Sequence, residues 1–213
     1  MMRIKYVFIV AFIFMLYCCV SGQDSQFIKV EQTKAFKEKI KEASSKQSNI
    51  QSDFAQEKAM EYLNVAIKSS GKFWYAKPNK VRWEYIVPYD YIIIMNNGKL
   101  TTVSGNNKND IDLSGNEVFK QINNLMSGMV TGNLFDSLDY KTDIYENDVQ
   151  YLIKLEPIDN FIAEIIPYIE IYIDKEKAVA SKIKLYESDS NYTIISFTNI
   201  RINESLKKDI FVN

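Results

Sequence analysis

The strongest constraint on the fold is a regular alternation of apolar and polar residues in the last third of the sequence. Isoleucine occupies every second position between residues 168 and 173, and Ile183 and Leu185 alternate with lysine and tyrosine. Successive side chains of a strand point to opposite faces, so this period predicts strands with one apolar and one solvated face. Such strands are typical of antiparallel sheets. We expect a β-meander over residues 168–200, preceded by strands at 140–146 and 149–156.

A second meander is predicted between residues 48 and 103. Its short apolar segments, which include 73–77, 80–87, 91–95 and 99–103, are separated by Gly, Pro or Asn. Two of the joints, Pro78-Asn79 and Asn96-Asn97-Gly98, are turn sequences because proline fixes φ and Asn-Gly tolerates positive φ. The Asn-rich stretch 104–112 is expected to be a loop.

Two amphipathic helices are predicted beside these strands. In residues 30–46, apolar side chains recur at steps of three and four. A second helix is expected from Ser114, where Glu117 completes a capping box, to Met129. Strands grouped with few helices predict an α+β fold with one large antiparallel sheet and helices gathered on one face.

The N-terminus has the pattern of a secretory signal peptide. Arg3 and Lys5 precede a short apolar run that ends in small residues, and cleavage after Gly22 would leave one domain over residues 23–213. A membrane anchor or a buried helix is the alternative, although the run is short for a span of ~20 residues. Lipid modification of Cys18 or Cys19 is a further alternative, less favoured than plain cleavage.

The residues needed for most catalytic chemistry are missing. The sequence has no His, and both cysteines lie in the predicted leader, so the usual general base, thiol nucleophile and zinc ligands are absent from residues 23–213. Loss of Arg3 and Lys5 would leave 24 basic and 27 acidic residues, a net charge of −3, which does not favour nucleic-acid binding. Aspartates between 136 and 148 could form a glycosidase pair or a calcium loop, but nothing in their spacing favours either, and such residues more often lie on a solvated turn. We expect no enzyme, no cofactor and no metal.

Aromatic side chains are concentrated in residues 71–91, where basic residues and two prolines interrupt them. In strands that turn at Pro78-Asn79, one face can carry Phe73, Tyr75, Val81, Trp83 and Tyr85. This set either fills an ordinary core or lines a space that an apolar ligand enters. Lys77 lies on the face of Phe73 and Tyr75, and an ammonium group needs polar partners there. It either points to water at the strand end or bonds to carbonyls of a covering helix.

These residues belong to a longer pattern that resembles the periplasmic outer-membrane lipoprotein carrier family, LolA. The pattern consists of Gly71, Phe73, Tyr75, Lys77-Pro78-Asn79, Arg82-Trp83-Glu84-Tyr85, Pro88 and Asn97-Gly98. The end of the chain is similar to the closing segment of the family in Phe197-Thr198-Asn199, Asn203 and Phe211. The likeness extends over nearly the whole chain, and the Pro-Asn to Arg-Trp-Glu-Tyr block is its most specific part.

The resemblance implies a strongly curved antiparallel sheet, an incomplete β-barrel, with helices forming a lid over an apolar cavity for lipoprotein acyl chains. It implies that Lys77, where arginine is the better-known residue, bonds to lid carbonyls as a latch. Lysine lacks the planar fork of arginine, so this latch would be looser. We expect the cavity to be lined by Phe73, Tyr75, Val81, Trp83, Tyr85, Ile92, Ile94, Ile171, Ile183 and Leu185.

The resemblance also implies the partners of a periplasmic, monomeric carrier. They are acylated lipoproteins, the inner-membrane lipoprotein-release ABC complex and an outer-membrane acceptor. Some carriers continue beyond the position of Phe211 with a loop and strand that contact the release complex, so the docking mode stays open. The alternative function is a LolA-like envelope sensor or regulatory lipid-binding domain. A glycolipid-handling enzyme is disfavoured by the missing His and Cys.

Overall fold

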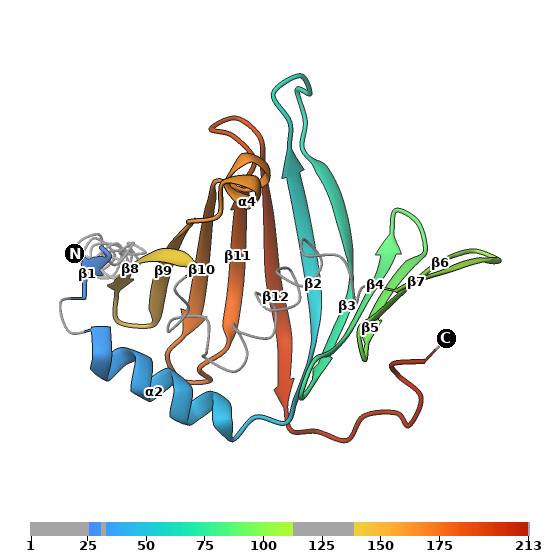
Figure 1. Cartoon of the computed structure of the whole chain (residues 1–213), viewed down its shortest axis with the longest axis horizontal. Helices are drawn as coiled ribbons and strands as arrows, with labels where there is room; N and C mark the ends of the chain where they lie inside the picture. The colour runs from blue at the N-terminus through green and yellow to red at the C-terminus, as the bar shows by residue number, and fades with distance from the viewer. Residues whose placement is uncertain (1–25, 31–32, 113–138, 213) are drawn as a thin grey trace, which may run out of the picture.

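The structure is a computed structural model that describes residues 26–30, 33–112 and 139–212. Its main feature is one sheet of twelve strands in the order β1-β8-β9-β10-β11-β12-β2-β3-β4-β5-β6-β7, in which every neighbouring pair is antiparallel (Figure 1). The end strands β1 and β7 lie far apart, so the sheet is curved but not closed. The expected α+β fold with an incomplete barrel is confirmed.

Two meanders make up the sheet. The first contains β2 (Asn49–Ala59), β3 (Ile67–Ala76), β4 (Lys80–Val87), β5 (Tyr91–Asn96), β6 (Lys99–Ser104) and β7 (Asn107–Asp112). The second contains β8 (Tyr140–Glu146), β9 (Gln150–Pro157), β10 (Tyr168–Asp174), β11 (Ala180–Tyr186) and β12 (Tyr192–Ile202), with the short β1 (Ile28–Lys29) at its edge. Antiparallel pairing of β2 with β12 joins the two meanders.

The neighbouring strands β3 and β4 approach each other closely at Gly71. A Cβ atom on Gly71 would lie 1.8 Å from the carbonyl oxygen of Glu84, so only glycine permits this approach. The register of the two strands also shifts between Ser70 and Gly71, which marks a bulge. Bulges increase the local twist and bend a strand. The glycine of the sequence pattern therefore helps to curl the sheet around its inner face.

The inner face, defined as the face that carries Trp83 and Ile171, holds two apolar clusters. One spans β8 to β11 and includes Phe36 and Ile40 of helix α2 (Thr33–Ser45). The other spans β2 to β6 and β12, with no α2 residue among its described members. The helix thus covers only one half of the inner face, below β8 to β12 in the view of Figure 1.

The C-terminal segment lies against the outer face. Arg82 points away from Trp83, and its Nη1 donates to the carbonyl oxygen of Ile210 at 3.4 Å. Its Nε and Nη2 both donate to Oε2 of Glu84. Asn96 donates to the carbonyl oxygen of Phe211 at 3.3 Å. The closing segment of the sequence pattern is thereby tied to β4 and β5.

Residues 107–112, expected to belong to a loop, form β7, whose exposed polar residues pair with β6 at the sheet edge. The apolar stretch before Pro167 forms a short helix, α4 (Asn160–Ile165), capped by Asp159. The predicted leader 1–22 and the predicted helix from Ser114 to Met129 lie outside the described residues.

Candidate functional site

The half of the inner face that α2 leaves uncovered contains a pocket of about 890 Å³, which we call the hollow. The floor is formed by β4, β5 and β6, and one wall by β7. Its lining residues are Gln56, Val81, Trp83, Tyr85, Tyr91, Ile93, Met95, Leu100, Thr102, Lys108, Asn109, Asp110, Ile111 and Ile195. The volume lies within the ~300–1,000 Å³ typical of small-molecule pockets, and the floor is predominantly apolar.

Trp83 is the centre of the aromatic packing beneath the hollow. Its ring lies 4.9 Å from the rings of both Phe54 and Phe73 and 6.0 Å from that of Phe197. The indole Nε1 is buried and has no hydrogen-bond partner among the described residues. Trp83 thus packs against the core on one side and lines the hollow on the other. Its packing against Phe73 accounts for part of the concentration of aromatic residues between 71 and 91.

Tyr85 places a hydroxyl group at one end of the hollow. Its hydroxyl donates to the side-chain oxygen of Gln56 at 3.0 Å. Burial raises the pKa of the Tyr85 phenol above its ordinary value, and the neighbouring Tyr89 and Tyr91 raise this pKa further. The group therefore stays neutral at physiological pH, so this end of the hollow is polar but uncharged.

Phe73 and Tyr75 share the inner face with Trp83 but do not line the hollow. Phe73 borders a separate void of about 40 Å³ together with Ile50 and Phe197. Tyr75 is fully buried, and its hydroxyl donates to the carbonyl oxygen of Pro78 at 3.1 Å. Of the five aromatic-stretch residues expected in the cavity, Val81, Trp83 and Tyr85 reach it.

The register of β5 corrects the expectation for Ile92 and Ile94. Trp83 pairs with Ile93, whereas Ile94 pairs with Arg82, which points outward. Ile92 and Ile94 therefore lie on the outer face, and the hollow is lined instead by Ile93 and Met95. The strand is apolar at each of positions 91–95, so its sequence contains no alternation that could distinguish the two faces.

Ile171, Ile183 and Leu185 lie on the inner face, but beneath α2. Ile171 pairs with Ile183, and both belong to the cluster that contains Phe36 and Ile40, with Leu185 packed against it. The structure does not bring these three residues to the hollow. They would face a ligand only if the helix moved away.

Lys77 follows β3 and reaches the C-terminal end of α2. Its ammonium group donates to the carbonyl oxygens of Ser44 at 2.7 Å and Ser45 at 3.1 Å. The last carbonyls of a helix have no partner within the helix and carry partial negative charge, so a lysine there is favourable. The contact ties helix α2 to the aromatic strand β3.

A second polar contact at this end of α2 was not anticipated from the sequence. The Asn203 side-chain oxygen accepts from the Ser48 backbone N–H at 2.6 Å, and its amide donates to the carbonyl oxygen of Lys46 at 2.9 Å. Asn203 has φ of 59°, a conformation that asparagine tolerates better than most residues. The Asn203 side chain thus attaches residues 46–48, which connect α2 to β2, to the end of β12. Its place in the closing sequence pattern was the available signal.

The described residues hold no group of three or more His, Cys, Asp or Glu side chains arranged to bind a metal ion. Within the same residues, no helix has the length and apolarity required to span a membrane.

Comparison with solved structures finds similar chains at low sequence identity. A LolA superfamily protein from Nitrosomonas europaea is 12% identical, over 84% of this chain and 96% of that chain, with a TM-score of 0.45. A chain of the Pseudomonas aeruginosa MucA/MucB complex is 13% identical with a TM-score of 0.51, and the alignment covers 83% of this chain but 59% of that chain. LprF from Mycobacterium bovis is 10% identical, over 84% and 96% of the chains, with a TM-score of 0.44. At 13% identity, the likeness to the chain of the MucA/MucB complex concerns the fold alone.

The family comparison covers most of the sequence. No curated protein matches the chain. Residues 45–213, however, match the family described as outer membrane lipoprotein carrier protein LolA. The match includes both meanders, the aromatic stretch and the closing segment. The chain is a member of the LolA family.

Proposed function

We propose that this protein is a periplasmic carrier that holds the acyl chains of lipoproteins in the hollow and moves them from the inner to the outer membrane. Family membership supports the kind of cargo. The observation that carries the proposal is the hollow of about 890 Å³, floored by apolar side chains such as Ile93 and Met95. Burial of an acyl chain is favourable by ~0.8 kcal/mol per CH₂ group. A water-accessible apolar floor is therefore suited to fatty tails and needs no catalytic residue.

Release of the cargo requires that binding not be maximal. Beyond the hollow, the inner face is covered by α2, whose Phe36 and Ile40 pack against the sheet. If α2 moves, acyl chains can contact Ile171, Ile183 and Leu185 in place of the helix. Two states that bury similar apolar areas differ by little free energy, so cargo can enter and leave without a nucleotide site in this chain.

Lys77 has the role of a latch in this proposal. Its bonds to Ser44 and Ser45 are made only while the C-terminal end of α2 lies against β3. Loaded and empty protein would then differ in whether these bonds are formed. The proposed partners are acylated lipoproteins, an inner-membrane release complex of the ABC type and an outer-membrane acceptor. The proposed leader, residues 1–22, would direct residues 23–213 to the periplasm as a single domain.

Transfer between membranes tests this function. The full chain is incubated with inner-membrane vesicles that contain a triacylated lipoprotein and the release complex, and is then mixed with outer-membrane vesicles. We expect the lipoprotein to co-purify with the chain and then to appear in the outer-membrane vesicles. Failure to bind the lipoprotein would contradict the proposal. Binding without delivery would favour the alternative, an envelope sensor or regulatory lipid-binding domain.

A further inference from the structure

Large apolar side chains are exposed at the tip of the β2–β3 hairpin. Tyr62 is 75% exposed and Val65 is 76% exposed, and Leu63 and Ile67 beside them are also exposed. Residues of this type are scattered singly on most protein surfaces, whereas a contiguous group marks an interaction site. The tip of this long hairpin extends beyond the other strands (Figure 1).

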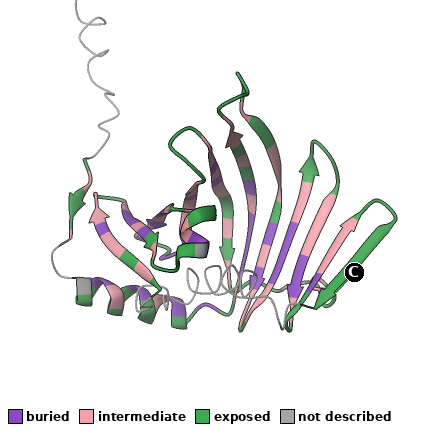
Figure 2. Ribbon diagram, turned by 45° about the horizontal axis from the view of Figure 1, so that its top comes forward, coloured by how far each residue is buried: buried purple, intermediate pink, exposed green. Residues whose placement is uncertain are grey.

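The neighbouring β4–β5 hairpin repeats this feature. Ile86, Val87 and Tyr89 at its tip are exposed, with Tyr89 at 68%. Val87 pairs with Ser70 of β3, so the second tip lies alongside the strand that leads down from the first. Both tips lie at the same end of the strands, and Figure 2 colours them as exposed. We call these seven residues of the two tips the apolar rim.

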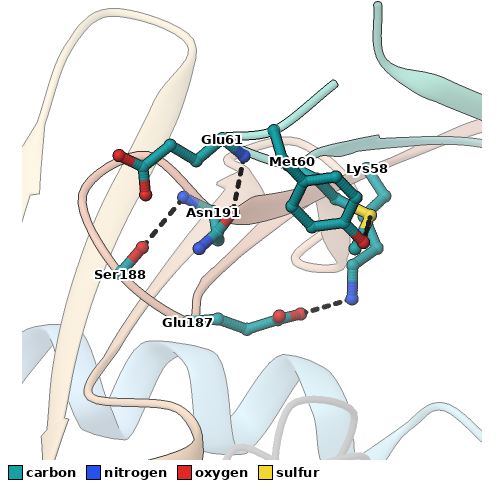
Figure 3. Close-up of polar contacts among 7 residues, drawn as sticks. Lys58, Met60, Glu61, Glu187, Ser188 and Asn191 are labelled. Carbon is teal, nitrogen blue, oxygen red and sulfur yellow. Dashed lines mark hydrogen bonds and ion pairs between the residues drawn. The ribbon is translucent and has the colours of Figure 1, made fainter.

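The first tip is held in place by polar contacts at its base (Figure 3). The Glu61 backbone N–H donates to the side-chain oxygen of Asn191 at 2.7 Å, and the Asn191 backbone N–H donates to Ser188 Oγ at 3.1 Å. Lys58 forms an ion pair with Glu187 at 2.8 Å. These contacts join the hairpin to the turn between β11 and β12. The exposed tip therefore projects from a base that is attached to the neighbouring turn.

The apolar rim continues into the hollow. Tyr85 and Tyr91 line the hollow, and they flank the β4–β5 turn that carries Ile86, Val87 and Tyr89. An acyl chain leaving the hollow past Tyr85 would therefore meet apolar side chains. The apolar rim therefore adjoins the hollow at Tyr85 and Tyr91, where a membrane in contact with the rim could receive an acyl chain.

We propose that the apolar rim inserts into the interface of a phospholipid membrane. A protruding tip fits a deformable lipid surface, and tyrosine suits the boundary between headgroups and acyl chains because its ring is apolar and its hydroxyl is polar. The lysines at the base of the first hairpin are paired, Lys58 with Glu187 and Lys68 with Glu57 at 3.2 Å. The contact therefore depends on apolar insertion and does not require anionic lipid. The purpose of the contact rests on the proposed carrier function, but the contact itself requires no cargo.

A position-specific fluorescence measurement tests this contact. In the full chain with Cys18→Ser and Cys19→Ser, an environment-sensitive dye is attached at Val65→Cys, or at Val149→Cys as the control, since Val149 is 63% exposed but outside the rim. Vesicles of phosphatidylethanolamine and phosphatidylcholine carry a quencher in their acyl region. We expect the dye at position 65 to shift to the blue and to be quenched, equally at low and high salt, while the dye at position 149 is unaffected. Because the readout is local, vesicle binding through the apolar N-terminus cannot produce it.

Further variants determine whether the rim acts as a unit. Tyr62→Ser with Tyr89→Ser should reduce the quenching at position 65, while Ile28→Ser with Val212→Ser, at similarly exposed sites, should not. Ile93→Asp, which targets the hollow, should leave the quenching unchanged, so failure of acyl binding and failure of membrane contact are distinguishable. Equal quenching at 65 and 149, or none at 65, would overturn the proposal. A change in the dye at 65 that follows protein concentration without vesicles would assign the rim to a second copy of the chain and would also overturn it.

Discussion

The ammonium nitrogen of Lys77 lies 2.7 Å from the carbonyl oxygen of Ser44, which joins the end of the aromatic strand β3 to the last turn of α2. Ser44 is fully buried, so the bond lies at the contact between the helix and the sheet. Helix α2, which covers half of the inner face, is thus held at one end by hydrogen bonds from the Lys77 ammonium group, and these bonds can break.

Replacement of Lys77 by leucine should weaken this attachment. Lys77→Leu removes two charge-assisted hydrogen bonds, and partial exposure of the site limits the loss to ~1–2 kcal/mol in the free energy of unfolding. Chemical denaturation measures this change. Lys80→Leu is the matched control because the ammonium group of Lys80 forms no hydrogen bond or ion pair with the described residues, and its effect should be small. A loss no larger than that of Lys80→Leu would contradict the latch, as would normal delivery of lipoprotein by Lys77→Leu.

Asn203 should stabilise the link between α2 and β2 through its side chain. Asn203→Ala removes the bonds to Ser48 and Lys46. It also leaves alanine at φ of 59°, a conformation that alanine tolerates less well than asparagine. We expect a loss of ~1–3 kcal/mol in unfolding free energy. Asn203→Gly tolerates the φ angle but loses the same hydrogen bonds and adds freedom to the unfolded chain, so a smaller loss than for Asn203→Ala would show the cost of the φ angle. Equal stability of the wild type and both variants would show that these bonds contribute nothing.

Gly71 should not accept any side chain. Gly71→Ala would bring Cβ to 1.8 Å from the Glu84 carbonyl oxygen, and two further backbone atoms lie within 3 Å. Because backbone rather than a flexible side chain must move, the variant should lose at least ~1–3 kcal/mol of stability or fail to fold. Ser70→Ala, at the adjacent residue, should change stability by less than ~1 kcal/mol. A stable Gly71→Ala protein would mean that β3 and β4 do not approach this closely.

The Tyr85 phenol should make stability fall at alkaline pH. Its pKa is raised in the folded protein by burial, so the unfolded chain ionises first, near the ordinary value of ~10, and the folded state loses relative stability as the pH rises above that value. Tyr85→Phe should reduce this alkaline loss. Denaturation at several pH values measures the slope, and the difference at pH 7 gives the effect of the lost bond to Gln56 separately. An unchanged alkaline slope would contradict the burial of this phenol.

Much of the sheet could be predicted from the sequence because the strands of the second meander alternate on a solvated and an apolar face. The helix at Thr33–Ser45 was likewise predictable from its apolar stripe. Strand β7 was not, since its six residues are all exposed and the strand is defined by pairing with β6 rather than by a buried face.

The site was predictable only in part. Strand β5 is apolar on both faces, and Ile94 on its outer face is buried, so the sequence could not distinguish Ile93 from its neighbours. The apolar alternation of Ile171 and Ile183 likewise identifies an inner face but not the half that α2 covers. Trp83 needed the three-dimensional packing as well, since its contacts with Phe54 and Phe197 come from distant strands.

The same contacts show which residue is the better probe of binding. Trp83→Asp would place a charge in the hollow, but a test of binding needs a variant that stays folded. The buried position of Trp83 among Phe54, Phe73 and Phe197 instead predicts a loss of ~3–5 kcal/mol on truncation, which would confuse binding with unfolding. Ile93 is only half-buried and lines the hollow.

Binding of a triacylated lipoprotein to Ile93→Asp and Ile92→Asp tests the central claim most directly. These neighbours on β5 are both half-buried, but only Ile93 faces the hollow. A carboxylate in the hollow would be desolvated by acyl chains, whereas one on the outer face would not. Native mass spectrometry should show lipoprotein bound to the wild type and to Ile92→Asp but not to Ile93→Asp. Equal binding by the two variants, both folded, would contradict an acyl-binding hollow.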